Sequence, residues 1–322
     1  MTDLPASALI VEVGPRDGLQ IERKILSVDE KLALVEALVA SGIREIEVGS
    51  FVSPRAVPQM AGTDELVGRL PRRPGVAYRG LWLNARGLER AIASGGVDLD
   101  GKLSITASET FARRNTNRSI EDALAEMPAW IDLYRAAGVE PQALSVMAAF
   151  GCNYEGPVPA ATVLRLVARV DALLADHGAR LRQVRLADTM GWANPEQVTR
   201  LVGDLRARWP DLGVRLHLHD TRGMAIANAY AALRIGVREF DAAVGGLGGC
   251  PFAANVGAAG NVATEDLVFL CEETGVATGI DLNALVEAGR LAESMVGRDL
   301  PGKLLKAGSL ARYRAARPDA PQ

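Results

Sequence analysis

The sequence predicts an α/β fold, a (β/α)8 TIM barrel with a C-terminal helical extension, because two kinds of segment alternate along the chain. Eight short apolar runs rich in β-branched residues are separated by longer segments of helical period. Strands separated by helices run parallel, and eight such units favour a closed barrel. No Gly-x-Gly-x-x-Gly follows the first run, which argues against a doubly wound sheet. The predicted strands are Ala8–Val13, Arg44–Val48, Val76–Leu83, Lys102–Thr106, Leu144–Ala149, Gln183–Ala187, Val214–Leu218 and Arg238–Val244.

Two of the intervening helices carry recognisable start signals. Ser27 and Glu30 have the spacing of a capping box, and Gly42 is placed to end the helix that follows. Asn194 precedes a proline at the first helical position and Gln197 at the third, which predicts a second helix start.

The chain is predicted to form one catalytic domain over residues 1–322, since no Pro/Gly/Ser-rich linker interrupts it. Residues from about Thr264 to Leu310 have a helical pattern and exceed the needs of the last barrel helix. We therefore expect residues 280–310 to form a helical extension and residues 311–322 a frayed tail.

The amino-acid composition limits the classes of protein and partner that this chain fits. Hydrophobic residues make up 48% and charged residues 23%, which is typical of a globular protein. The net charge of −3 gives no indication of nucleic-acid binding, and no run approaches the ~20 apolar residues of a membrane span. Three widely spaced cysteines favour a reducing compartment, so we expect a cytoplasmic protein without membrane or nucleic-acid partners.

The sharpest signal for chemistry is His217-Leu218-His219 in the seventh predicted strand. Side chains two apart on a strand share a face, so both imidazoles enter the barrel together at its carboxyl end, where barrel enzymes have their sites. Two structural histidines at the rim are the alternative. Asp17 and Asn261 are the available oxygen donors nearby. A set of two His, one Asp and one Asn suits Mg²⁺ or Mn²⁺, with Zn²⁺, Co²⁺ and Fe²⁺ as alternatives.

Arg16 stands beside Asp17 at the end of the first strand. Its permanent positive charge is suited to stabilising negative charge on a reacting oxygen. The alternative is a salt bridge at the rim with Glu47 or Asp188, and both roles are compatible.

We expect different roles for the three cysteines and the third histidine. Cys250 lies in Gly-Gly-Leu-Gly-Gly-Cys-Pro, where a mobile loop could bring the thiol to a reacting carbon as an acid or base. The alternative is a small buried apolar residue, which suits Cys271 better. Cys152 fits either description, and His177 is expected to cap a helix end.

Four groups of residues resemble motifs of the 3-hydroxy-3-methylglutaryl-CoA lyase family, from Val11 to about Leu304. They are Val13-Gly14-Pro15-Arg16-Asp17-Gly18-Leu19-Gln20; Ser50-Phe51-Val52-Ser53-Pro54 with Val57-Pro58-Gln59-Met60; His217-Leu218-His219-Asp220-Thr221; and Gly246-Leu247-Gly248-Gly249-Cys250-Pro251 with Gly260-Asn261-Val262-Ala263-Thr264-Glu265-Asp266. Related isopropylmalate and citramalate synthases typically have Glu-Arg-Ala-Gly-Asn in place of the cysteine loop, so the resemblance is to the cleaving branch.

The resemblance implies that a divalent metal, Mg²⁺ or Mn²⁺, binds Asp17, His217, His219 and Asn261. It implies cleavage of 3-hydroxy-3-methylglutaryl-CoA to acetyl-CoA and acetoacetate, with an acyl-CoA as partner and a homo-oligomeric state. The implied catalytic residues are Arg16 at the reacting oxygen, Cys250 as proton carrier, Glu47 and Asp188 as supporting carboxylates, and His217 or a water as base.

Departures from the family pattern put the acyl group in question. The segment between Cys250 and Asn261 is two residues longer than expected, Arg222 replaces Tyr, Asn153 replaces Pro, and Gly49 replaces Thr. Citramalyl-CoA or a longer 3-hydroxy-3-alkylglutaryl-CoA is therefore an alternative substrate, and a non-catalytic ligand-binding barrel is a further alternative. Candidate substrate or CoA contacts are Gln20, Ser50, Asn84, Asn115 and Arg222.

Overall fold

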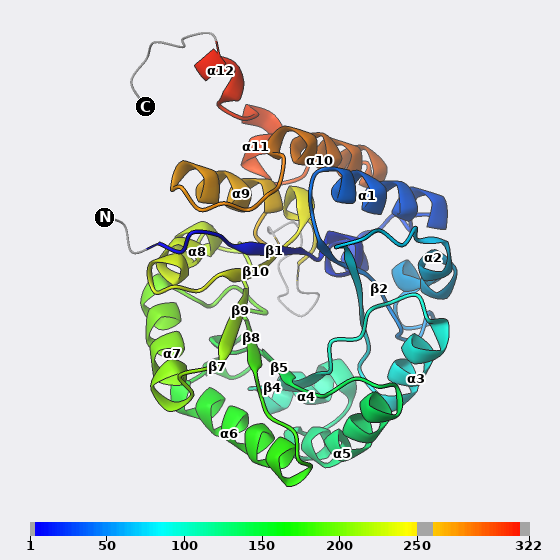
Figure 1. The fold of residues 1–322 in the computed structure, drawn as a ribbon, viewed down its shortest axis with the longest axis vertical. Coiled ribbons are helices and arrows are strands. Elements are labelled where there is room, and N and C mark those ends of the chain that lie inside the picture. The colour runs from blue at the N-terminus through cyan, green and yellow to red at the C-terminus, as the bar shows by residue number, and fades with distance from the viewer. Residues whose placement is uncertain (1–3, 250–259, 316–322) are drawn as a thin grey trace.

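The computed structural model describes residues 4–249 and 260–315, and it has the predicted (β/α)8 barrel, with a ring of helices around the strands (Figure 1). All eight predicted strands are confirmed. The hydrogen-bonded order is β3-β2-β1-β10-β9-β8-β5-β4, and every pairing within it is parallel. The barrel strands are β1 Leu9–Glu12, β2 Glu45–Ser50, β3 Ala77–Leu81, β4 Lys102–Thr106, β5 Ala143–Met147, β8 Gln183–Ala187, β9 Gly213–His217 and β10 Glu239–Ala242. An additional antiparallel hairpin joins β6 (Gly151–Cys152) to β7 (Gly156–Pro157).

The helices begin where the capping residues predict. Ser27 accepts a hydrogen bond from the Glu30 N–H in a full capping box, and Asn194 does the same with Gln197. The helices are α1 Val28–Ala40, α2 Thr63–Arg69, α3 Ala85–Ser94, α4 Glu109–Thr116, α5 Ile120–Ala136, α6 Ala160–Asp176, α7 Pro195–Arg208, α8 Ala225–Arg234, α9 Thr264–Glu273, α10 Leu282–Val296, α11 Lys303–Ala307 and α12 Ala311–Ala315. None of the described helices is both long and apolar enough to cross a membrane.

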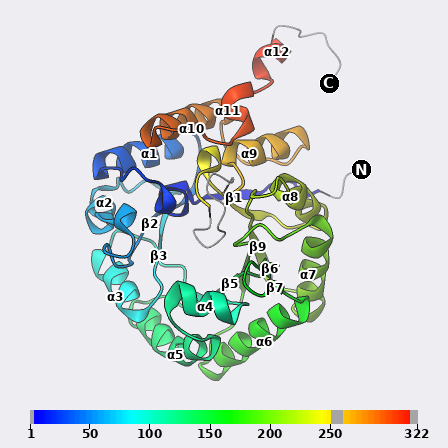
Figure 2. The same ribbon diagram turned by 180° about the vertical axis from the view of Figure 1, so that it is seen from behind.

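The predicted helical extension is present after α9. Helix α10 packs against α1 at the outside of the ring, and α11 contacts both α9 and α10 (Figures 1 and 2). Residues 311–315 of the expected tail are helical, and residues 316–322 lie outside the described residues. The chain continues as α12, where both guanidinium nitrogens of Arg314 pair with the Glu273 carboxylate of α9 at 2.8 and 2.9 Å.

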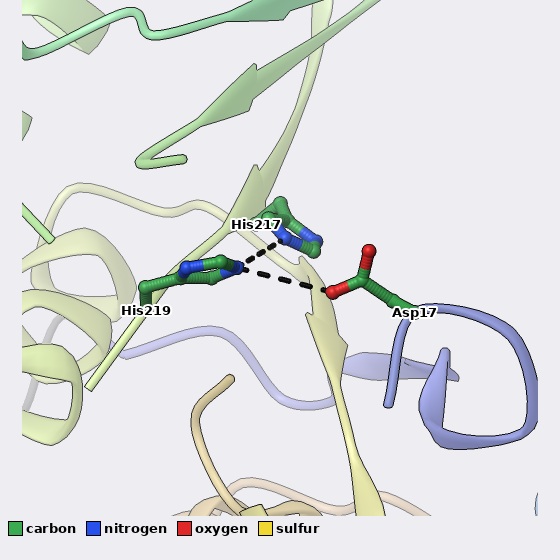
Figure 3. Close-up of side chains that lie close together, drawn as sticks. All are labelled: Asp17, His217 and His219. Atoms are coloured by element: carbon green, nitrogen blue, oxygen red, sulfur yellow. Dashed lines mark hydrogen bonds and ion pairs between the residues drawn. The ribbon is translucent and has the colours of Figure 1, made fainter. Parts of the chain in front are cut away.

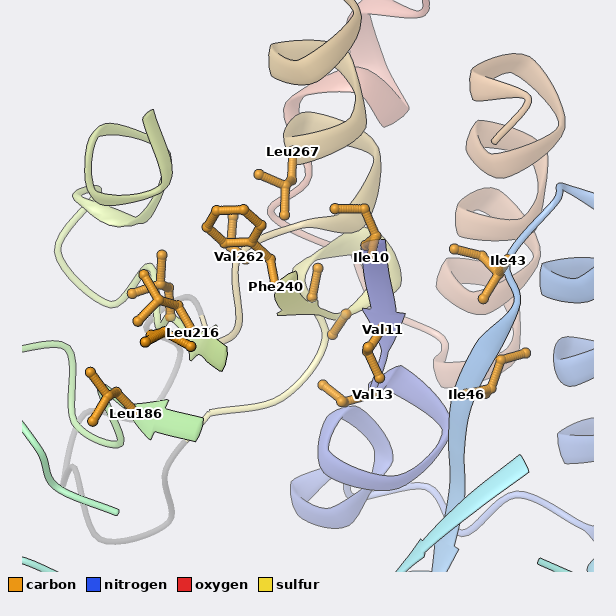
Figure 4. Packing of buried hydrophobic residues seen from close by; sticks show 14 of the residues in the cluster. Ile10, Val11, Val13, Ile43, Ile46, Leu186, Leu216, Phe240, Val262 and Leu267 are labelled. Carbon is orange, nitrogen blue, oxygen red and sulfur yellow. The ribbon is translucent and has the colours of Figure 1, made fainter. Parts of the chain in front are cut away.

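The barrel has an apolar layer outside its strands and a charged interior. Ile10, Leu216 and Phe240 alternate with the interior positions and pack toward the helices (Figure 4). The side chains that face inward include ion pairs, among them Arg215 with Glu45 at 2.9 Å and with Glu239 at 3.0 Å. The barrel core is therefore polar along the axis, and a cavity opens above it.

Candidate active site

A cavity of about 710 Å³ extends from the carboxyl ends of the strands into the charged interior. This is where barrel folds place their functional sites. The cavity brings together six of the predicted site residues, which are Arg16, Asp17, Gln20, Asn115, His217 and His219.

Two imidazoles and a carboxylate meet at one point of this cavity. His217 ends β9, His219 follows it, and Asp17 projects from η1, the π-helical turn Gly14–Gly18 after β1 (Figure 3). The two Nε2 atoms are 3.0 Å apart, and Asp17 Oδ2 lies 3.9 Å from His219 Nε2. One ligand atom from each residue lies within 4.8 Å of the other two.

The fourth predicted ligand, Asn261, completes this set. Its Nδ2 donates to Asp17 Oδ2 at 2.8 Å and to the Leu247 carbonyl at 3.0 Å. Its Oδ1 is buried and accepts no hydrogen bond from any described residue. A buried amide oxygen without a hydrogen-bond donor, on a residue that contacts Asp17, is a ligand that a divalent cation would satisfy. The donor set therefore fits the predicted metal.

The charge states at this point also suit a cation. Burial lowers the pKa of His219 to about 3, so its imidazole is neutral. Burial alone would raise the pKa of Asp17, but the adjacent Arg16 guanidinium outweighs it and holds that pKa below its usual range. A neutral imidazole and an ionised carboxylate are the forms that bind metals.

Asp241 and Arg185 control the orientation of His217. Asp241 Oδ2 lies 3.2 Å from His217 Nδ1, and an Arg185 nitrogen lies 2.9 Å from the same atom. When Nε2 is free for a cation, Nδ1 carries the proton and donates it to Asp241. In the other tautomer Nδ1 accepts from Arg185. Either form of His217 thus has a buried partner behind it.

Arg16 links the metal set to the barrel interior. Its Nε donates to Glu47 Oε2 at 2.6 Å, and its other nitrogens pair with Asp17 and again with Glu47. Burial alone would raise the pKa of Glu47, but Arg16, Lys102 and Arg185 together hold it below its usual range. The salt bridge expected as an alternative is therefore present with Glu47, and it fixes the guanidinium at the cavity wall.

Asp188 pairs with backbone groups of its own loop. Its Oδ1 accepts from the backbone N–H groups of Trp192 at 2.6 Å and Ala193 at 3.1 Å, and not from Arg16. Burial raises its pKa to about 7. Asp188 therefore supports the turn after β8.

Three predicted substrate contacts also serve the backbone among the described residues. Asn84 accepts from the Gly87 N–H as the N-cap of α3, and the Ser50 hydroxyl donates to the Leu81 carbonyl. Arg222 is exposed and donates to the carbonyls of Met190 and Gly191. Short polar residues after strands are also preferred for capping and turns, which the sequence pattern alone does not separate from ligand binding.

The cysteines divide as follows. Cys250 and its loop, 250–259, lie outside the described residues. Cys271 is buried on α9, and burial raises the pKa of its thiol to about 12, as expected for a structural residue. Cys152 is buried with Ser108, whose hydroxyl lies 3.0 Å from the sulfur. His177 caps α6 as predicted, with its Nδ1 2.8 Å from the Leu173 carbonyl.

Lys102, Arg185 and Asp241 were not singled out from the sequence. All three face the barrel interior from strands. Glu47, which the sequence did predict, faces the same interior. A signal was available in the alternation of charged and apolar residues in Glu45-Ile46-Glu47 and Glu239-Phe240-Asp241. Strands covered on both faces are usually apolar throughout, so period-two charges indicate a polar interior.

A family model described as HMGL-like matches residues 8–292, which include every predicted metal ligand and Arg16. The chain belongs to the HMGL-like family.

Individual relatives of this HMGL-like protein match over nearly their whole length. It is 40% identical to a 3-hydroxy-3-isohexenylglutaryl-CoA/hydroxy-methylglutaryl-CoA lyase of Pseudomonas aeruginosa, over 95% of this chain and 98% of the relative. It is 41% identical to an (R)-citramalyl-CoA lyase of Chloroflexus aurantiacus, over 93% and 94%. A solved HMG-CoA lyase from Acinetobacter baumannii, in complex with coenzyme A and 3-methylmalate, matches with a TM-score of 0.85 at 37% identity, covering 98% of both chains.

Proposed function

We propose that this protein is a divalent-metal-dependent carbon–carbon lyase that cleaves 3-hydroxy-3-methylglutaryl-CoA to acetyl-CoA and acetoacetate. The observation that carries the proposal is the buried Arg16, fixed between Asp17 and Glu47 beside the two imidazoles of His217 and His219. Relatives named hydroxymethylglutaryl-CoA lyases, which match over most of the chain, support the same reaction.

Asp17, His217, His219 and Asn261 are the residues that would hold the cation. When bound, a divalent cation supplies Lewis-acid chemistry to the oxygen atoms of a substrate, and Mg²⁺ and Mn²⁺ suit this donor set. Asp241 keeps His217 in the orientation that directs Nε2 toward the site.

The reaction breaks the C2–C3 bond of the acyl group. The electron pair of that bond passes to the thioester as an enolate, C3 becomes a ketone, and the C3 hydroxyl proton passes to a base. The candidates for this base are His217 and a water molecule. Arg16 stabilises the negative charge that develops on the C3 oxygen, because its guanidinium keeps its proton throughout.

Cys250 is proposed to protonate the enolate carbon, which completes acetyl-CoA. Cys250→Ala should slow cleavage by about 10²–10⁴-fold, which is the usual contribution of a general acid. The affinity for Mn²⁺, measured by calorimetry, should stay that of the wild type, because the four proposed ligands are untouched. Cleavage at the wild-type rate would remove Cys250 from the mechanism.

Citramalyl-CoA is a second candidate substrate, favoured by the 41% identity to a citramalyl-CoA lyase. The same bond cleavage would then give acetyl-CoA and pyruvate. A longer 3-hydroxy-3-alkylglutaryl-CoA is a third, given the name of the Pseudomonas aeruginosa relative.

The test is turnover of all three acyl-CoAs by purified protein, with Mg²⁺ or Mn²⁺ and after treatment with a chelator. We expect cleavage with the metal, its loss on chelation and its return when metal is added back. The substrate with the highest kcat/KM identifies the acyl group. A protein that cleaves none of them but still binds coenzyme A would be a non-catalytic ligand-binding barrel. The homo-oligomeric state stays an expectation from the family resemblance, and the cytoplasmic location stays a prediction from the sequence.

A further inference from the structure

Part of the cavity wall carries polar side chains that neither the metal set nor Arg16 uses. Lys102 and Ser104 lie two apart on β4 and face the cavity, and Ser145 on β5 pairs in register with Ser104. Each of the three lines the cavity. An ammonium and two hydroxyls on adjacent strands therefore point into the same space.

The ammonium of Lys102 has no close partner among the described residues. Its Nζ lies 3.5 Å from Glu47 Oε1 and 3.5 Å from Asp100 Oδ2. A direct hydrogen bond between an ammonium and a carboxylate measures about 2.7–2.9 Å, so both contacts are loose. The hydroxyls of Ser104 and Ser145 likewise make no hydrogen bond to any described residue.

The other two cationic side chains that line the described cavity are already paired with carboxylates. Arg16 is held by Asp17 and Glu47, and Arg185 by Asp241. Glu47 receives Nε and a second nitrogen of Arg16, and Arg185 approaches it at 3.7 Å. Glu47 therefore has a closer cationic partner in Arg16, and its 3.5 Å contact with Lys102 leaves the ammonium able to form a direct ion pair with a ligand.

Lys102 is also close to the reacting centre. Glu47 contacts Lys102 through Oε1 and Arg16 through Oε2, so a single carboxylate separates the two cations. A ligand whose hydroxyl carbon lies at Arg16 has a group one or two carbons away within reach of this wall. A negative group there would need a cation, because a carboxylate without one pays a large desolvation cost in a buried site.

We propose that Lys102, with Ser104 and Ser145, binds the free carboxylate of the acyl group and so selects 3-hydroxyacyl-CoAs that are acids at the end remote from the thioester. This rests on the proposed lyase function. The carboxylate replaces the two loose contacts of Lys102 with a direct ion pair, and the hydroxyls donate to its oxygens.

The test compares 3-hydroxy-3-methylglutaryl-CoA with the methyl ester of its remote carboxylate, for the wild type and for Lys102→Met. A hydrogen-bonded charge pair contributes about 10–100-fold, so the wild type should prefer the acid by that factor in kcat/KM. In Lys102→Met, kcat/KM for the acid should fall by about the same factor, while the ester changes less than about threefold. Lys102→Arg should restore most of the preference.

Arg169→Met is the matched control, because it removes one positive charge from the exposed face of α6. Its kcat/KM for both compounds should equal that of the wild type. Ser104→Ala and Ser145→Ala should each weaken the acid alone, by about 3–10-fold. If citramalyl-CoA proves to be the substrate, the same comparison is made between citramalyl-CoA and the methyl ester of its free carboxylate.

The outcomes separate this proposal from the lyase function. A wild type that cleaves neither compound nor any other 3-hydroxyacyl-CoA overturns the lyase function itself. The carboxylate site alone is overturned if the wild type has the same kcat/KM for the acid and the ester. It is also overturned if Lys102→Met lowers kcat/KM by the same factor for both compounds. The wild-type comparison needs no variant, so it decides the question even where Lys102→Met does not fold.

Discussion

Two groups of carboxylates lie close together in this barrel, and their pKa values are shifted in opposite directions. Asp17, Glu47 and Asp241 face guanidinium groups, which hold their pKa values below the usual range against the effect of burial. Glu12 and Glu265 lie under the turn η4 (Val244–Gly246), where burial raises their pKa to about 7 and about 8.

The second group accepts hydrogen bonds from backbone and hydroxyl groups. Glu12 accepts from the Gly14 N–H at 2.7 Å, from the Val244 N–H at 3.0 Å and from the Thr264 hydroxyl at 2.6 Å. These bonds tie the turn that carries Arg16 to the turn that leads to residue 250. The role of each buried carboxyl group thus depends on whether a cation lies next to it. The groups paired with a guanidinium stay ionised and contribute negative charge to the site. The groups without a cation accept hydrogen bonds from the backbone around the site.

The most severe way to break the first group is Arg16→Met. Loss of the guanidinium should lower kcat by a factor on the order of 10³ or more, because it removes charge stabilisation from the reacting oxygen. It also leaves Glu47 buried without its closest partner, which should cost about 3–5 kcal/mol of unfolding free energy. Steady-state kinetics and urea unfolding measure the two effects.

Arg16→Lys is the control that separates charge from geometry. A lysine keeps the positive charge but cannot bridge Asp17 and Glu47 with a planar fork. We expect stability close to that of the wild type and activity between those of the wild type and Arg16→Met. Full activity in Arg16→Met would show that the proposed stabilisation of the C3 oxygen is wrong.

A milder way to disturb the same group is Asp241→Asn. The neutral amide keeps the shape but weakens the partner of His217 Nδ1, so the affinity for Mn²⁺ should fall by about 10–100-fold. Calorimetric titration measures this, and excess Mn²⁺ should recover much of the activity. Asp211→Asn, on an exposed carboxylate paired with Arg180, is the control and should bind Mn²⁺ like the wild type. Unchanged affinity in Asp241→Asn would count against the orienting role.

Much of the fold and part of this site follow from local sequence signals. Alternating segments and caps predict the barrel, and His217-Leu218-His219 predicts a shared cation because strand side chains alternate. Arg16 and Asp17 were found because a charged pair directly follows the first strand.

The remaining parts depend on contacts that no local signal specifies. Asp188 follows a strand as Asp17 follows β1, yet the turn after β8 directs its oxygen to two backbone N–H groups. Lys102 and Arg185 lie within strands, where their role depends on which neighbours they meet across the barrel. The pairing of Arg185 with Asp241 joins residues from β8 and β10, and the sequence separation hides it.

The second group can be tested without touching the reaction, through Glu265. Its Oε2 accepts from the Gly245 N–H at 3.0 Å, and its Oε1 is buried without a partner among the described residues. Its pKa is about 8 in the folded state, against an ordinary value of 4.5. Between these two pH values the folded chain keeps a proton that the unfolded chain has released. Unfolding free energy must therefore fall as pH rises through that window and level off above about pH 8.

Glu265→Gln should remove this dependence, because the amide stays neutral and its oxygen can still accept from Gly245. Near pH 5 its Tm should be close to that of the wild type. By pH 8.5 it should be higher by roughly 10 °C, because a carboxyl whose pKa is about 8 in the folded chain and 4.5 in the unfolded chain costs about 5 kcal/mol of unfolding free energy across that window. Glu287→Gln, on the exposed face of α10, should shift Tm equally at all pH values. A constant difference for Glu265→Gln would mean that this carboxyl is ionised in the folded protein and that the contrast between the two groups is wrong.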